Sequence, residues 1–333
     1  MTERVLVLGD GGWGTALAMV LVERGLQVTL WGRSPEYVQV MARTRRNPKY
    51  LPGVTIPDDI RLTSELAEAT RADVIFAAVP SKFLRSVMLE FAPVYPRNRT
   101  MVSAAKGIEN DSLMRPTEII RSILGADVPT VVISGPSHAE EVSRRMPTTI
   151  VAASDDMGRA RRIQDLLHTE RFRVYTNDDE IGVELGGALK NVIAIAGGIV
   201  DGLGFGDNTK AALLTRGIVE MARLGVAMGA KRETFFGLAG IGDLITSCIS
   251  PHGRNRGVGE KLGRGQKLEQ ILARMEQVAE GVHTSKSVCQ LAEKLAVEMP
   301  ICQQVERVLF EGKEPSVAVR DLMTRGLKDE WDW

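Results

Sequence analysis

The sequence predicts an α/β fold, with a doubly wound, mostly parallel sheet in its N-terminal part and an all-α C-terminal part. Three observations support this prediction. Up to about residue 177, short apolar runs alternate with amphipathic segments. Most of these apolar runs are continuous, as expected for parallel strands that are covered on both faces. After residue 178 the strand-like runs stop and helical periodicity takes over, so the 333 residues are best divided into two domains.

The apolar runs predict the strands Arg4–Leu8, Gln27–Trp31, Val74–Val79, Thr100–Ala105, Val131–Ser134, Thr149–Ala153 and Arg173–Tyr175. Between them, a period near 3.6 residues predicts the helices Ala16–Glu23, Leu84–Phe91, Thr117–Leu124 and Gly158–Leu167. The C-terminal part shows the same period in Ala211–Met228, Lys267–Met275, Ser285–Val297 and Val305–Phe310. The change in composition near residues 178–183 therefore predicts one domain over 1–180 and a second over 181–333.

Composition and charge exclude several function classes. The 42 basic and 42 acidic residues cancel, which leaves no overall charge suited to nucleic acid or to an anionic membrane. The three cysteines are odd in number and form no CxxC pair, so reduced thiols in a cytoplasmic protein are expected. The four histidines lack metal-ligand spacing, so no metal site is expected. The apolar stretch Val192–Val200 is too short to span a bilayer.

A glycine-rich loop follows the first predicted strand. Gly9, Gly11 and Gly14 form the pattern GxGxxG between that strand and the first predicted helix, and a second strand follows in place. In this context the first glycine permits a tight turn and the second lets the backbone approach a pyrophosphate. The third lets helix and strand pack closely. The pattern therefore predicts a Rossmann-type domain that binds a nicotinamide dinucleotide.

The end of the second predicted strand bears on the choice of cofactor. Folds specific for NAD usually carry an acid there to bind the ribose hydroxyls. Here Trp31, Gly32 and Arg33 come first, and the nearest acid that follows is Glu36. Because Arg33 can pair with a 2′-phosphate, we expect NADP, with NAD also accepted. A solvated arginine after a strand is the alternative interpretation.

Four further segments carry candidate site residues: SAAKGIE with Lys106; ISGPSHAEE with Gly135, Ser137 and Ala139; ELGGALKNVIAIAGG with Lys190 and Asn191; and GLAGIGDLITSCISPHGRNRG with Asp243, Ser247, Arg254 and Asn255. Each candidate also has an ordinary interpretation. Lys190 could extend its charge to solvent along a packed stem. Asp243 could cap the helix that starts at Leu244, and Ser137 could be another cap. Arg254 could belong to a solvated basic loop.

The order of the motifs is more specific than any one of them: GDGGWGTALA, SAAKGIE, SGPSHAEEV, ALKNVIAIAGG, GLAGIGDLITSC, GRNRGVGEKLGRG and VAEGVHT. In this order the chain resembles the NAD(P)-dependent glycerol-3-phosphate dehydrogenases of the bacterial type, over nearly its whole length. The resemblance implies an NAD(P)-binding Rossmann domain over 1–180 and an all-helical substrate and catalytic domain over 181–333. It also implies reversible reduction of dihydroxyacetone phosphate to sn-glycerol 3-phosphate, which supplies glycerophospholipid synthesis.

The resemblance also implies roles for individual residues. Lys190, in the LKN motif, is the expected acid/base group, with Asp243 of the GDL motif beside it. Substrate contacts are expected at Lys106, Gly135, Ser137, Lys190, Asn191, Asp243, Ser247, Gly253, Arg254 and Asn255. Cofactor contacts are expected at Gly9, Gly11, Gly12, Trp13, Gly14, Arg33, Lys106, Ala139, Arg254, Val278 and Glu280. A homodimer is expected from the family and from the need to cover apolar helices.

Two positions depart from the commonest pattern of that family: Gly12 and Gly253 each stand where a serine is frequent. Two alternative functions also stay open from the sequence. One is a related β-hydroxyacid or 6-phosphogluconate-type dehydrogenase, which would share the catalytic lysine but lack the loop at Arg254. The other is a dinucleotide-binding sensor without turnover, for which Lys190 would be dispensable.

Overall fold

The computed structural model describes residues 2–330, and the chain folds as two compact units. The first unit comprises residues 1–106 and 115–180, and the second comprises 107–114 and 181–333. The short segment 107–114 therefore belongs with the C-terminal helices. It is tied to them because the Ser287 hydroxyl donates to the Ile108 carbonyl oxygen and to Asn110 Oδ1. The sequence pattern did not indicate that residues 107–114 belong to the second unit.

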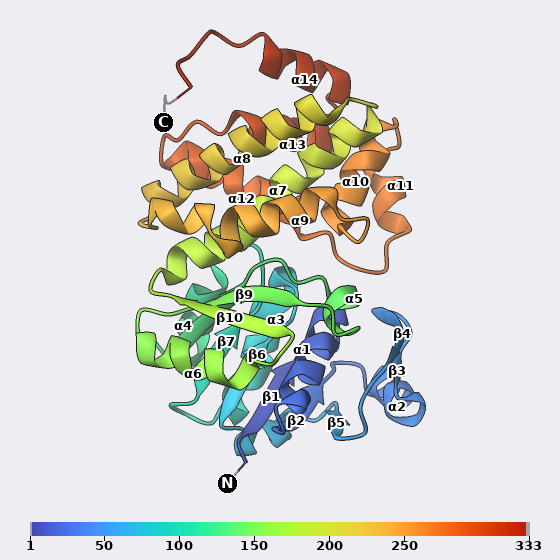
Figure 1. Cartoon of the computed structure of the whole chain (residues 1–333), viewed down its shortest axis with the longest axis vertical. Helices are drawn as coiled ribbons and strands as arrows, with labels where there is room; N and C mark the ends of the chain where they lie inside the picture. The colour runs from blue at the N-terminus through green and yellow to red at the C-terminus, as the bar shows by residue number, and fades with distance from the viewer. Residues whose placement is uncertain (1, 331–333) are drawn as a thin grey trace. The chain divides into compact units, whose positions relative to one another are not determined.

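Within the described residues, the first unit contains a sheet of eight strands in the order β10-β9-β8-β7-β6-β1-β2-β5 (Figure 1). The strands are β1 (Arg4–Leu8), β2 (Gln27–Trp31), β5 (Ile60–Thr63), β6 (Val74–Ala77), β7 (Thr100–Ser103), β8 (Thr130–Ser134), β9 (Thr148–Ala153) and β10 (Phe172–Asn177), with β3 (Arg46–Asn47) and β4 (Leu51–Thr55) forming a separate hairpin. From β1 the sheet extends to β2 and β5 on one side and to β6, β7 and β8 on the other, so the direction of strand order reverses between β1 and β6. Doubly wound sheets bind ligands at such a point, beside the carboxyl ends of the strands.

The predicted fold class is confirmed, with two corrections to the strands. The strand β9 pairs antiparallel with β8 and is an exception to the parallel pairing expected for most of the apolar runs. Between them lies only the four-residue helix α5 (Ala139–Val142), too short to carry the chain back to the start of β8 as a parallel crossover requires. The strands β3, β4 and β5 were not predicted, because they are short and β4 contains Pro52 and Gly53, which usually interrupt strands.

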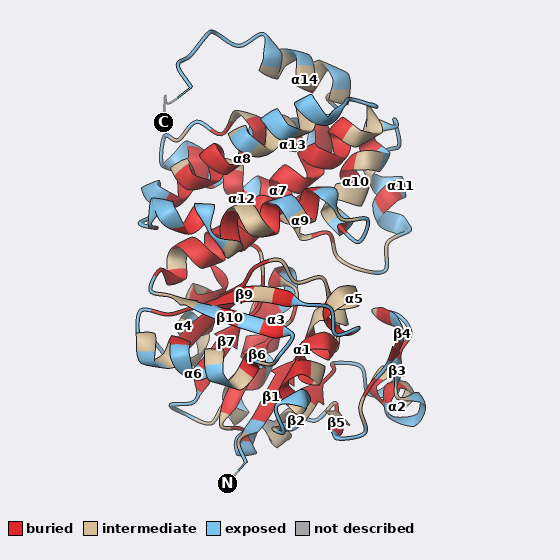
Figure 2. Cartoon of the chain, viewed as in Figure 1, coloured by how far each residue is buried: buried red, intermediate tan, exposed pale blue. Residues whose placement is uncertain are grey.

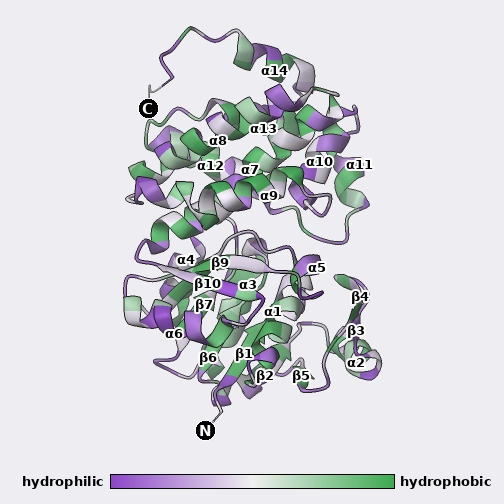
Figure 3. Ribbon diagram, in the orientation of Figure 1, coloured by the Kyte–Doolittle hydropathy of each residue, from purple (hydrophilic) through white to green (hydrophobic). Residues whose placement is uncertain are grey.

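Helices cover this sheet in two layers (Figure 1). They are α1 (Gly12–Glu23), α2 (Pro35–Thr44), α3 (Ser81–Phe91), α4 (Pro116–Leu124) and α6 (Met157–Leu167), with 3-10 turns η1 (Leu66–Arg71) and η2 (Ala92–Val94). The helix α1 packs against α5 and α6, whereas α3 packs against α4. The strands between these layers are almost entirely apolar and buried, as in β1 and β6, which appear green in Figure 3. A continuous run such as VLVL is therefore covered on both faces, as parallel strands require.

The second unit is helical throughout its described residues from 181 onward. Its elements are α7 (Glu180–Gly202), α8 (Asp207–Ala227), η3 (Arg232–Phe236), η4 (Leu238–Gly242), α9 (Asp243–Ile249), α10 (Arg254–Gly263), α11 (Leu268–Ala273), α12 (Glu280–Lys294), α13 (Pro300–Phe310) and α14 (Pro315–Met323). By length and composition α7 could cross a membrane, but its apolar stretch is wholly buried inside the protein (Figure 2). It is the central helix of a folded core.

Glycines let α10 approach α7 at the distance of backbone contact. A Cβ added at Gly198 would overlap the carbonyl oxygen of Arg256, and one added at Gly259 would overlap that of Ile195. No larger residue fits at either position without moving the two helices apart. The start of α10, with Arg254 and its neighbours, is thereby held against the helix that carries Lys190.

Candidate functional site

The loop after β1 is built for close approach of an anion to the backbone. Gly9 has a φ of +114°, a conformation that side chains rarely adopt, and a Cβ added at Gly14 would overlap the Gly9 carbonyl oxygen. At Gly11, by contrast, no described atom lies within 4 Å of an added Cβ. Helix α1 begins directly afterwards, and in the described chain no side chain caps its first amide groups. This open cradle of N–H groups fits the pyrophosphate of a dinucleotide.

The neighbouring residues Gly12 and Trp13 are held by other segments of the first unit. A Cβ added at Gly12 would lie 2.6 Å from the Tyr50 carbonyl oxygen and 3.5 Å from the Cβ of Ala139. A serine at this position would therefore collide with backbone, which explains the glycine in this chain. Trp13 is half-buried and lies beside Phe172, with 6.5 Å between the ring centroids.

Sequence reasoning missed Asn47, which fixes the glycine loop from the β3–β4 hairpin. The side chain is buried, and its Nδ2 donates to the Asp10 carbonyl oxygen at 2.7 Å and to Thr15 Oγ1 at 2.9 Å. Its Oδ1 accepts from the Tyr37 hydroxyl at 2.6 Å. The Asn-Pro pair at 47–48 is a turn signal, and it was the clue in the sequence.

Arg33 lies just beyond β2 and is exposed. Its guanidinium pairs with the carboxylate of Glu90 on α3 at 2.5 Å. A 2′-phosphate would therefore have to compete with this carboxylate for Arg33. Both side chains are largely in solvent, where such a pair contributes at most about 1 kcal/mol.

Lys106 and Ser137 converge on one carbonyl group at the carboxyl edge of β7 and β8. Lys106 Nζ donates to the Gly135 carbonyl oxygen at 2.9 Å, and the Ser137 hydroxyl donates to the same atom at 3.0 Å. The interpretation of Ser137 as a helix cap is wrong, because α5 begins after His138 and the Ser137 hydroxyl bonds backward. Gly135 has a φ of +132°, so this turn also depends on glycine.

The second unit buries a charged cluster around Lys190 in α7. Lys190 Nζ donates to Asp243 Oδ1 at 2.9 Å and to Ser247 Oγ at 2.5 Å. The Lys190 side chain is 9% exposed and that of Asp243 is 3% exposed, so both ordinary interpretations fail. Lys190 does not extend to solvent, and Asp243 does not act as a cap, since it is the first residue of α9 and Gly242 precedes it as the N-cap.

Cys248 directly follows Ser247 and is also buried. Burial raises the pKa of its thiol to about 12, although the charges of Lys210 and Lys190 act in the opposite direction. The thiol therefore stays protonated at neutral pH and is a poor nucleophile. Cys248 is therefore not a candidate nucleophile in this cluster.

The loop that leads into α10 supplies exposed and half-buried donors. Arg254 is exposed, and its Nη1 donates to the Val278 carbonyl oxygen at 3.0 Å, which leaves other N–H groups of the guanidinium for a ligand. A Cβ at Gly253 would lie 2.7 Å from the Ser247 carbonyl oxygen, so the glycine lets this loop close onto α9. Gly253 thus contributes backbone rather than a hydroxyl group.

A chain of amide contacts links α7, α10 and α12. Asn255 Nδ2 donates to Asn191 Oδ1 at 2.8 Å, and Asn255 Oδ1 accepts from the Gly281 backbone N–H at 2.9 Å. Asn191 in turn donates to the Gly187 carbonyl oxygen at 3.2 Å. Glu280, the first residue of α12, is half-buried beside this chain. Asn191 and Asn255 are therefore hydrogen-bonded to each other. Val278 and Glu280 are close in sequence to Gly281, which donates to Asn255.

Within each unit the structure brings some of the expected site residues into contact. The first unit holds those at the glycine loop and those around Gly135, and the second holds the cluster at Lys190 with the Arg254 loop. Among residues 2–330, no group of three or more His, Cys, Asp or Glu side chains is placed to hold a metal ion.

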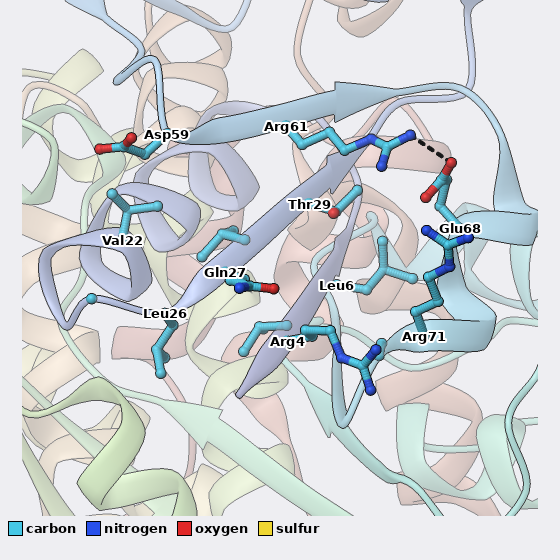
Figure 4. A pocket seen from close by; sticks show the side chains of 14 residues that line it. Arg4, Leu6, Val22, Leu26, Gln27, Thr29, Asp59, Arg61, Glu68 and Arg71 are labelled. Carbon is cyan, nitrogen blue, oxygen red and sulfur yellow. Dashed lines mark hydrogen bonds and ion pairs between the residues drawn. The ribbon is translucent and has the colours of Figure 1, made fainter. Parts of the chain in front are cut away.

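A cavity of about 610 Å³ lies at the amino ends of strands β1 and β2 in the first unit (Figure 4). It is lined by residues at the amino ends of strands, such as Arg4 of β1 and Gln27 of β2, together with Arg61 and Glu68, which form an ion pair at 2.6 Å. The glycine loop follows the carboxyl end of β1. The cavity is therefore separate from the cofactor cradle.

Comparison with known proteins identifies the family. A family model described as NAD-dependent glycerol-3-phosphate dehydrogenase N-terminus matches residues 4–160, and its C-terminus counterpart matches residues 179–320. The chain belongs to the NAD-dependent glycerol-3-phosphate dehydrogenase family. The resemblance inferred from the sequence motifs is thus confirmed, and so is the expectation of an NAD(P)-dependent dehydrogenase.

Relatives from this glycerol-3-phosphate dehydrogenase family match the whole chain. A glycerol-3-phosphate dehydrogenase [NAD(P)+] of Pelotomaculum thermopropionicum is 50% identical, covering 100% of this chain and 96% of the relative. A second, from Salinibacter ruber, is 51% identical over 99% of this chain and 97% of the relative. The crystal structure of the glycerol-3-phosphate dehydrogenase of Coxiella burnetii superposes with a TM-score of 0.93 at 39% identity, covering 97% of this chain and 99% of that one.

Proposed function

We propose that the chain reversibly reduces dihydroxyacetone phosphate to sn-glycerol 3-phosphate with NAD(P)H, with residues 1–180 holding the cofactor and 181–333 supplying the catalytic group. The observation that carries the catalytic assignment is the buried ammonium of Lys190, held by Asp243 and Ser247. A cation is seldom buried unless it is paired and hydrogen-bonded. Names of relatives that match the full chain support the substrate.

When bound at the glycine loop, the reduced cofactor supplies a hydride to the ketone carbon. Negative charge then develops on the carbonyl oxygen, where the Lys190 ammonium stabilises it and donates a proton to form the hydroxyl group. Lysine suits this task better than arginine, whose proton does not leave at accessible pH. In the reverse direction, neutral Lys190 accepts the hydroxyl proton.

Asp243 and Ser247 position this ammonium. Asp243 balances its charge, and the 2.9 Å hydrogen bond directs one N–H away from the substrate. Ser247 accepts a second N–H at 2.5 Å. The two fixed partners reduce the entropy lost when the ammonium meets the substrate.

The substrate phosphate needs fixed donors, and Arg254 offers a planar fork for a charge-assisted pair. Asn255 can add an amide N–H, since Asn191 uses one of its two. Lys106 and Ser137 would contact the substrate from the turn at Gly135, and Arg254 would also reach the cofactor. These residue roles form part of the proposal.

The setting of the reaction is proposed as well. We infer that the enzyme works in the cytoplasm, supplies glycerophospholipid synthesis and forms a homodimer. Three free cysteines suit a reducing compartment. The second unit exposes several large apolar side chains that a second copy could cover, among them Val226, Phe236, Ile245 and Ile249. Sedimentation at several protein concentrations would measure the oligomeric state.

A single assay panel tests the activity. The purified chain should oxidise NADPH or NADH when dihydroxyacetone phosphate is added, and should not reduce NADP with 6-phosphogluconate. A chain that binds nucleotide yet turns over neither substrate would be a sensor, and the proposal would fail.

A further inference from the structure

The second residue of the glycine loop is an aspartate, Asp10, and its side chain reaches the end of β2. A Cβ added at Gly32 would overlap Asp10 Oδ2 and lie 2.7 Å from Asp10 Cγ. The Asp10 carboxylate therefore occupies the space that a side chain of residue 32 would take. Gly32 directly follows β2, where dinucleotide folds specific for NAD present an acid to the ribose.

We propose that Asp10 replaces the acid missing from the end of β2, accepting hydrogen bonds from the adenosine ribose hydroxyls and disfavouring a 2′-phosphate, so that this chain prefers NADH to NADPH. The inference rests on the cofactor class of the proposed function and specifies it further. A carboxylate accepts hydrogen bonds from neutral hydroxyl groups but repels a phosphate that carries up to two negative charges.

Backbone contacts hold the main chain of Asp10 beside the end of β2, and the carboxylate accepts a hydrogen bond from its own backbone. Strands β1 and β2 pair in register, with Leu8 opposite Trp31, and the Gly9 N–H donates to the Trp31 carbonyl oxygen at 2.9 Å. The Gly32 N–H donates to the Thr63 carbonyl oxygen at 3.0 Å. Asn47 holds the Asp10 carbonyl from the other side. The loop and the strand end are therefore tied to each other by backbone hydrogen bonds, with the Asp10 carboxylate beside Gly32.

The electrostatic surroundings favour Asp10 over Arg33 as the stronger determinant. Burial raises the pKa of Asp10, opposed by a hydrogen bond from its own backbone and by the charge of Lys49. A carboxylate that is partly removed from water gains more from ribose hydroxyl donors than an exposed one. Arg33 is exposed and already paired with Glu90, so its attraction for a 2′-phosphate is screened by solvent.

Nucleotide binding without turnover tests the proposal. ADP-ribose and 2′-phospho-ADP-ribose would be titrated by calorimetry into the wild type, Asp10→Ala and the isosteric Asp10→Asn. Asp59→Ala is the matched control, because it removes the same charge from the amino end of β5, in the cavity of Figure 4. The ratio of KM values for NADH and NADPH would be measured on the same four proteins.

We expect the wild type to bind ADP-ribose more tightly, and both Asp10 variants to shift the ratio toward the 2′-phosphate by at least about tenfold. Asp59→Ala should leave the ratio unchanged. An unchanged ratio in both Asp10 variants, or a wild type that prefers 2′-phospho-ADP-ribose, would overturn the role of Asp10 alone. If the wild type binds neither nucleotide, the cofactor assignment of the loop falls with it. Thermal melting of Asp10→Asn separates loss of fold from loss of selectivity.

Discussion

The glycine loop of the first unit and the Lys190 cluster of the second show two ways of building a site. The loop uses backbone groups, and its key residues Gly9, Gly11 and Gly14 lie within six positions of one another. The cluster uses side chains, and Lys190 meets Asp243 across 53 residues of chain. At Gly14 an added side chain would meet the Gly9 carbonyl oxygen, whereas at Gly11 the described protein leaves open space. The cluster depends on particular side chains, because the Lys190 ammonium is held by the Asp243 carboxylate and the Ser247 hydroxyl.

The largest expected effect separates proton transfer from binding. Lys190→Ala should lower turnover by about two to four orders of magnitude, the usual range for losing a general acid, while cofactor affinity stays near that of the wild type. Steady-state kinetics and calorimetric titration would measure the two quantities. Lys190→Arg is the matched variant: it keeps the charge but releases no proton, so it should be nearly as inactive. Turnover within severalfold of the wild type would remove Lys190 from the mechanism.

The next effect concerns the phosphate of the substrate. Arg254→Leu should raise the KM for dihydroxyacetone phosphate by the equivalent of about 2–4 kcal/mol, as when a charged group loses its partner. Unphosphorylated dihydroxyacetone, a poor substrate from the start, should lose little further. Arg264→Leu, at the other end of α10 and exposed, is the matched control. Equal losses on both substrates, or an equal loss of cofactor affinity, would make Arg254 a cofactor or structural residue.

Substitutions in the glycine loop should distinguish a glycine needed for dinucleotide binding from a glycine needed for folding. Gly11→Ala places a methyl group where the structure leaves room, so stability should hold while dinucleotide affinity falls by roughly tenfold, about 1.4 kcal/mol. Gly14→Ala should instead lower the melting temperature, since its methyl group meets the Gly9 carbonyl oxygen. Gly326→Ala, also in open space, is the control for both measurements. Unaltered dinucleotide affinity in Gly11→Ala would argue against pyrophosphate binding at this loop.

The smallest effect concerns Arg33. Arg33→Ala should lower the affinity for NADPH a few-fold and the affinity for NADH by less. The effect is small because an exposed arginine already paired with Glu90 contributes only about 1 kcal/mol or less to binding. Glu90→Gln should have the opposite effect, since it releases the guanidinium. Equal changes for the two cofactors would make Arg33 a surface residue without a role in selectivity.

The sequence by itself determined the fold class, the glycine loop and the family. It could do so because these depend on local order: β1 and β2 were predicted to the residue, since a continuous apolar run followed by GxGxxG has few alternatives. Candidate site residues could be named from the motifs. The alternatives of a solvent-exposed lysine, a helix cap or a solvated basic loop could not be excluded, because the local sequence does not determine whether a side chain is buried.

Only the tertiary structure determined which groups those side chains contact and how far they are buried. Lys190 was more readily interpreted as a solvent-reaching lysine until α9 brought Asp243 and Ser247 against it. The antiparallel turn at β9 and the placement of Asp10 at Gly32 likewise depend on packing between distant segments. The physical reason is the same in each case. Charge, exposure and free space at a residue are set by neighbours far along the chain, whereas strand and helix patterns are set by neighbours within a few positions.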